Sequence, residues 1–107
     1  MKSGIVNYLR EHKGASFIEL QEHVPGFKGN NTVGVLDKNV IFWTGVSPEA
    51  TKALDELLTD KVIELIHIGP LVYFIDGAVM KLPIAKRIEK YKTRHWIPVV
   101  MSLRRRD

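Results

Sequence analysis

The chain of 107 residues contains no cysteine. Disulfide bonds, thiolate nucleophiles and cysteine-ligated zinc are therefore excluded. No apolar stretch reaches the roughly 18 residues that a membrane-spanning helix needs. Residues 1–14 also lack the long apolar run of a signal peptide. These absences predict a soluble, cytoplasmic protein with no membrane span.

Patterns that would indicate catalysis or metal binding are absent as well. The four histidines show no metal-ligand spacing. The segment GFKGNN lacks the Lys-Ser/Thr ending that a phosphate-binding P-loop requires. Spacing alone assembles no carboxylate pair and no Ser-His-Asp set. We therefore expect no enzyme activity, no cofactor and no metal ion.

Positive charge is concentrated in the last quarter of the chain. Residues 1–80 carry seven Lys/Arg and ten Asp/Glu, whereas residues 81–107 carry nine Lys/Arg and two Asp/Glu. This split favours a polyanionic partner bound through the basic end, and a solvated tail that aids solubility is the alternative. It also predicts two parts, a folded domain over residues 1–80 and a basic helix and tail over residues 81–107.

Apolar spacing and turn residues predict the first half of the fold. A helix is expected from a cap at Ser3 to about Lys13, and a second from Phe17, where Ser16 and Glu19 have capping-box spacing. A polar loop is expected over residues 26–31. Two short apolar runs, residues 33–36 and 40–43, then predict a hairpin.

The segment SPEATKALDELLTDKVIELIHIGPLVYFIDG, residues 47–77, gives the strongest local pattern. Ser47 and Pro48 predict the start of a helix whose buried stripe is Ala50, Ala53, Leu54, Leu57 and Leu58. Residues 62–68 and 71–75 predict two strands around Gly69-Pro70.

A helix followed by such a hairpin, in a small basic protein, resembles the recognition helix and wing of the winged helix-turn-helix superfamily. The resemblance implies an α+β fold with a three-helix core, a small antiparallel sheet that forms the wing, and a basic C-terminal extension. It also implies nucleic-acid binding, with DNA as the expected partner and transcription regulation as the expected role.

The predicted third helix is a poor phosphate reader, because its polar face carries Glu49, Asp55, Glu56 and Asp60 against two lysines. A solvated structural face is the favoured interpretation. Phosphate contacts are instead expected from loop and C-terminal cations, which are Lys28, Lys38, Lys81, Lys86, Arg87, Lys90, Lys92, Arg94, Arg104, Arg105 and Arg106. A helix is predicted from Pro83, with Ile84, Ile88 and Tyr91 on one face.

Aromatic residues beside these cations leave two interpretations open. Tyr91, His95 and Trp96 suit stacking on unpaired bases, or Tyr91 and Trp96 belong to the core. The alternative function is a protein-interaction module that forms a homodimer or docks through residues 95–103, HWIPVVMSL. A membrane-surface adaptor that uses the basic C-terminal helix is the third possibility.

Overall fold

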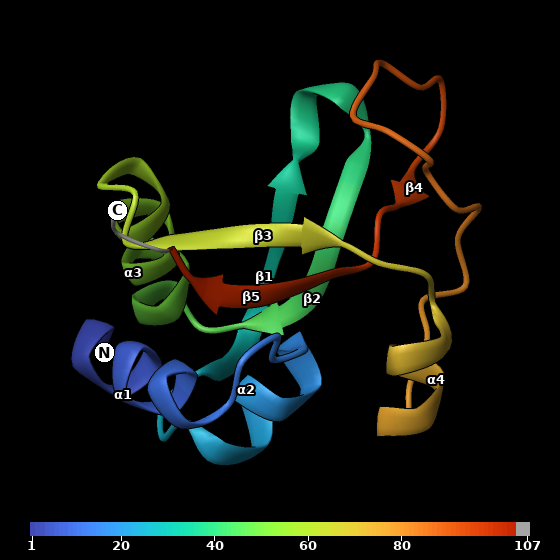
Figure 1. Cartoon of the computed structure of the whole chain (residues 1–107). Helices are drawn as coiled ribbons and strands as arrows, with labels where there is room; N and C mark the ends of the chain where they lie inside the picture. The colour runs from blue at the N-terminus through green and yellow to red at the C-terminus, as the bar shows by residue number, and fades with distance from the viewer. Residues whose placement is uncertain (105–107) are drawn as a thin grey trace.

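The computed structural model describes residues 1–104 and has an α+β fold, as the sequence predicts. Residues 1–104 form four α-helices and two small β-sheets, and Figure 1 shows the α-helices arranged around the sheets. The elements in chain order are α1 Lys2–Glu11, α2 Phe17–His23, β1 Lys28–Val35, the short 3-10 helix η1 Leu36–Lys38, β2 Val40–Val46, α3 Pro48–Thr59, β3 Ile63–His67, α4 Leu71–Asp76, β4 His95–Trp96 and β5 Val99–Leu103.

The caps of α2 and α3 are those predicted. The Ser16 hydroxyl accepts the Glu19 backbone N–H at 3.2 Å, and the Glu19 carboxylate accepts the Ser16 backbone N–H at 3.5 Å. The Ser47 hydroxyl accepts the Ala50 N–H at 3.0 Å. Helix α1 differs in one respect, since Met1 is its N-cap and Ser3 lies inside the helix.

The two sheets join distant parts of the chain. Strands β1 and β2 form the predicted antiparallel hairpin, and β4 adds to β2 in parallel. Strand β3 pairs with β5 in the second sheet. The expected polar loop over residues 26–31 is wrong from Lys28 onward, because β1 begins there. Gly29 permits this, since a Cβ at that position would overlap the backbone of Ser47.

The predicted wing hairpin around Gly69-Pro70 does not form. Its first strand is present as β3, but Leu71–Asp76 is helix α4. Strand β5 pairs with β3 in place of the predicted hairpin partner. Helix α4 ends before Gly77, which has the left-handed conformation with φ 111°. The composition of residues 71–76 favours a strand, but these residues form a helix that places Tyr73 fully buried in the core. The gain from this burial outweighs the local preference for a strand.

The helix predicted from Pro83 is also absent, and residues 83–94 form an irregular segment. Its backbone pairs with β4 instead: the Ala85 N–H donates to the Trp96 carbonyl at 2.7 Å, and the Trp96 N–H donates to the Pro83 carbonyl at 2.8 Å. Of the expected apolar face, Ile84 and Ile88 are exposed and Tyr91 is half-buried, whereas Ala85, outside that face, is buried. A short helix without a buried stripe gains too little to nucleate.

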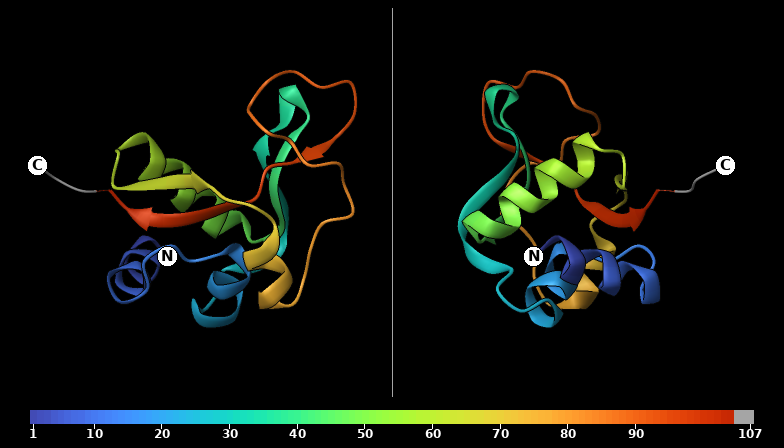
Figure 2. Two further views of the ribbon diagram at one scale, coloured as in Figure 1. Left: turned by 45° about the vertical axis from the view of Figure 1, so that its right-hand side comes forward. Right: turned by 90° about the vertical axis from the view of Figure 1, so that its left-hand side faces the viewer.

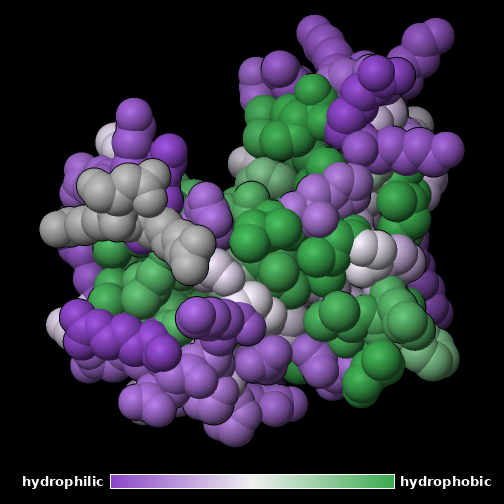
Figure 3. All heavy atoms as spheres, viewed as in Figure 1, coloured by the Kyte–Doolittle hydropathy of each residue, from purple (hydrophilic) through white to green (hydrophobic). Residues whose placement is uncertain are grey.

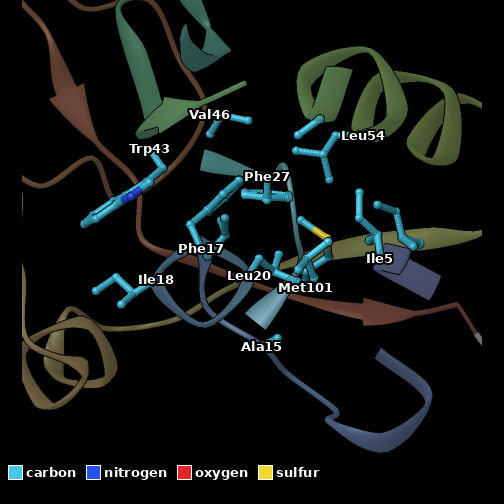
Figure 4. Packing of buried hydrophobic residues seen from close by; sticks show 14 of the residues in the cluster. Ile5, Ala15, Phe17, Ile18, Leu20, Phe27, Trp43, Val46, Leu54 and Met101 are labelled. Carbon is cyan, nitrogen blue, oxygen red and sulfur yellow. The ribbon is translucent and has the colours of Figure 1, made fainter. Parts of the chain in front are cut away.

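One hydrophobic core extends through helices and both sheets. Figure 4 shows side chains such as Phe17, Phe27, Leu54 and Met101 directed toward one another. The same cluster contains the C-terminal residues Ala85, Trp96, Ile97, Val99 and Met101. The predicted boundary at residue 80 therefore does not divide this core.

Candidate nucleic-acid interface

The irregular loop of residues 86–94 and the adjoining His95 of β4 are attached to the tip of the β1–β2 hairpin. The Tyr91 N–H donates to the Lys38 carbonyl at 3.1 Å, and the Asn39 side-chain amide donates to the Tyr91 carbonyl at 2.9 Å. The His95 N–H donates to the Asn39 carbonyl at 2.8 Å. Both views in Figure 2 show the loop beside the hairpin tip. These bonds place Lys38 beside a cationic segment that is distant in sequence.

The cations brought together in this way form what we term the basic surface: Lys38, Lys86, Arg87, Lys90, Lys92 and Arg94. Lys38 is half-buried and the other five are exposed. Asp37 and Glu89 are the only acidic residues in residues 36–39 and 86–95. Glu89 pairs with Arg87 at 3.2 Å. Figure 3 shows strongly hydrophilic side chains projecting over this end of the molecule.

Two of the three candidate stacking residues, Tyr91 in the loop and His95 at the start of β4, form a pair. The rings of Tyr91 and His95 stack with centroids 4.0 Å apart and planes 18° apart, and both side chains are half-buried. Trp96, in contrast, is 1% exposed and its indole N–H donates to the Phe42 carbonyl at 3.0 Å. Trp96 is therefore a core residue, and the prediction that it stacks on bases is wrong.

The other predicted cations lie elsewhere. Lys28 begins β1, at the end of the strand away from the hairpin tip. Lys81 lies in the stretch that leads from α4 to the loop, and Arg104 follows β5, with its N–H donating to the Val62 carbonyl at 2.9 Å. Arg105 and Arg106 lie outside the described residues. The structure thus gathers six of the eleven predicted cations.

Figure 1 shows helix α3 on the opposite side of the molecule from the loop that carries most of the basic surface. Glu49, Asp55 and Asp60 are exposed. Glu56 pairs with Lys2, and this contact lowers the pKa of the Glu56 carboxyl and raises the pKa of the Lys2 amine. A polyanion on the basic surface would therefore not face these carboxylates.

Residues 95–103, the predicted docking segment, are mainly internal. Trp96, Ile97, Val99, Val100 and Met101 are all buried. The apolar side chains of this segment are already covered by the core, so they offer little surface for docking.

Sequence reasoning missed an apolar surface at α4. Leu71, Phe74 and Ile75 are 66%, 70% and 72% exposed. A groove of about 460 Å³ runs beside the helix, lined by Gly69, Pro70, Leu71, Phe74, Val79, Met80, Ile84 and Trp96. Pro70 before the segment and Gly77 after it are helix-boundary signals that could have identified α4.

A second groove, of about 240 Å³, lies between α3, the β1–β2 hairpin and β3. Its lining is apolar apart from Asp55 and two threonines, Thr32 and Thr51. Across residues 1–104, no group of three or more His, Asp or Glu side chains could hold a metal ion. Within the same range, every helix is too short or too polar to cross a membrane.

No family model, no curated protein and no solved structure matches the chain.

Proposed function

We propose that this protein binds nucleic acid through the basic surface, by contacts directed mainly at phosphate groups. The main support is the set of three hydrogen bonds that fix Lys38 and Asn39 to Tyr91 and His95. They hold the loop with its five cations beside Lys38. A flexible tail would lose conformational entropy when a ligand ordered its charges, and a fixed loop loses less. A spaced set of Lys and Arg side chains is what a phosphate backbone requires.

The Tyr91–His95 pair adds a stacking group at the centre of the cations. Aromatic groups among cations suit single strands, whose bases are free to stack, as well as duplex backbones. The proposal needs no helix in a DNA groove, which agrees with the acidic character of α3. A role in transcription regulation would require that the protein binds DNA in preference to RNA.

The test is an anisotropy titration with labelled single-stranded DNA, duplex DNA and RNA at several salt concentrations. The test variant changes Lys86, Lys90 and Lys92 to Gln. The matched control changes Lys13, Lys52 and Lys61 to Gln, which removes the same charge from exposed positions elsewhere.

The test variant should weaken binding and reduce the log–log salt slope by about 0.9 for each duplex phosphate that the variant no longer neutralises. The control should keep nearly the wild-type slope. Equal reductions in both variants would show that net charge, rather than the basic surface, drives binding. An absence of binding to all three nucleic acids at low salt would refute the proposed function.

A further inference from the structure

Six apolar side chains around α4 form an exposed surface, which we term the α4 patch: Leu71, Val72, Phe74, Ile75, Val79 and Ile84. Their exposed fractions run from 37% for Val72 to 72% for Ile75. Figure 3 shows this patch as a hydrophobic group at the lower right of the molecule. A contiguous surface of this kind on a small protein marks an interaction site.

The patch combines a ridge with a groove. Leu71 and Phe74 line the groove of about 460 Å³, together with Val79, Met80 and Ile84. Val72 and Ile75 do not line it, although they are exposed on the same short helix. The patch therefore presents a protruding apolar edge directly beside an apolar depression.

The patch has almost no charge to select a partner of one sign. Residues 69–80 contain a single ionisable acid or base apart from Tyr73, namely Asp76. The Asp76 carboxylate accepts the Ser16 hydroxyl at 2.6 Å, which directs it toward the protein. An anionic membrane or an acidic helix would be recognised by a cluster of cations around the apolar residues, whereas two cations, Lys81 and Lys86, flank Ile84 in sequence. The hairpin tip with Lys38 lies at the other end of this side of the molecule (Figure 1).

We propose that the α4 patch binds a second copy of this chain in a two-fold symmetric dimer. In such a dimer, Ile75 of each copy enters the groove of the other, beside Val79 and Ile84. A two-fold interface requires a surface that complements itself, and an adjacent ridge and groove meet that requirement. Residues 69–80 carry no free charge, so the contact made by α4 itself brings no like charges together; the exposed Lys81 and Lys86 flank Ile84 in sequence.

The available area lies at the low end of the range for a stable dimer. At the exposed fractions given above, the six side chains present on the order of 500–600 Å² of apolar surface, taking roughly 150–200 Å² for each fully exposed side chain. The exposed Pro70 and Ala78 extend the patch. A standard interface buries about 800 Å² on each partner. No cation lines the groove, so the dimer does not depend on nucleic-acid binding.

The first experiment measures sedimentation equilibrium over a range of protein concentrations. Wild type should be dimeric, and Ile75→Asp should weaken the dimer by at least about 30-fold, the effect of removing one central interface side chain. Ile66→Asp is the matched control, because Ile66 is 42% exposed on β3, away from the patch. It should dimerise as wild type does. Circular dichroism should confirm that both variants are folded.

The second experiment tests the pairing, and the absence of native cysteine means that only the introduced thiols can react. Mixing Ile75→Cys with Ile84→Cys under mild oxidation should give disulfide-linked heterodimers in preference to either homodimer. A wild-type protein that stays monomeric at high concentration would overturn the inference and leave the proposed function intact. Monomers that sediment with anionic vesicles, with the binding abolished in Ile75→Asp, would also overturn it and assign the patch to lipid.

Discussion

Replacing Tyr73 with Phe isolates a single hydroxyl in the centre of the fold. Tyr73 is fully buried, and its ring contacts Trp43 and Trp96, with centroids 4.8 Å and 5.3 Å away. The hydroxyl donates to the Val99 carbonyl at 2.6 Å and accepts the Phe17 N–H at 3.1 Å. One oxygen atom thus connects α4, β5 and the first turn of α2.

The cost follows from the groups that the substitution leaves unpaired. Phe keeps the ring and its packing, so cavity formation contributes little. The Phe17 N–H is one of the first-turn donors of α2, which have no partner within the helix. Leaving a buried group without its hydrogen bond costs about 1–3 kcal/mol. In a domain of this size, this lowers the melting temperature by roughly 4–8 °C for each kcal/mol.

Urea and thermal unfolding, followed by tryptophan fluorescence and circular dichroism, measure this change in stability. Tyr91→Phe is the matched control, since the Tyr91 hydroxyl donates to the Arg87 carbonyl at 3.0 Å at an exposed position. The control should change stability by less than about 0.5 kcal/mol. If Tyr73→Phe were equally neutral, the hydroxyl would not hold α4 on the core, and this explanation of the helix would be wrong.

Two further predictions concern glycine and pH. Gly34→Ala should lower the free energy of unfolding by about 1–3 kcal/mol in urea, because the new Cβ would overlap the Val40 carbonyl oxygen. The control, Gly4→Ala inside α1, should raise it by about 0.5–1 kcal/mol. Equal effects of the two substitutions would contradict the β1–β2 register. Burial raises the pKa of Tyr73, and burial with a hydrogen bond to Glu19 raises the pKa of Tyr8 to about 12, from an ordinary 10.0. Above about pH 10 the unfolded chain loses these protons first, so stability should fall as pH rises, and Tyr73→Phe should flatten that fall above about pH 10.

Elements with local signals could be predicted from the sequence. Helices α2 and α3 have side-chain caps and helical apolar spacing within a few residues. Strands β1 and β2 are joined by a short connection, so their pairing follows from nearby residues. These features depend little on the rest of the chain, and the structure confirms them.

Elements decided by distant partners could not be predicted. Pairing of β3 with β5 depends on residues that follow α4 and the loop, and local composition favoured a partner next in sequence. The segment LVYFID has the composition of a strand, but only Tyr73 reaches the core. The predicted helix from Pro83 is absent for the same reason, since the backbones of Pro83 and Ala85 pair with that of Trp96 further along the chain.

The same distinction applies to the candidate site. Charge density identified the cations of residues 86–94 without any knowledge of the fold. The fold decides that Lys38 joins these cations and Lys28 does not. The tip of the β1–β2 hairpin contacts the loop, and Lys28 lies at the other end of β1. The α4 patch had no counterpart in the sequence reasoning, because an apolar run was interpreted as a buried strand.

Residues 69–94 contribute little to the core, because only Tyr73 and Ala85 among them are buried. Most of the remaining side chains in this segment are exposed hydrophobic residues and cations. Among residues 1–104, Arg87 is the only cation of the basic surface within ion-pair distance of a carboxylate. Exposed apolar groups and unpaired like charges do not stabilise a folded chain. Folding therefore does not account for the composition of this segment, whereas a phosphate partner at one end and a second copy at the other would cover both kinds of side chain.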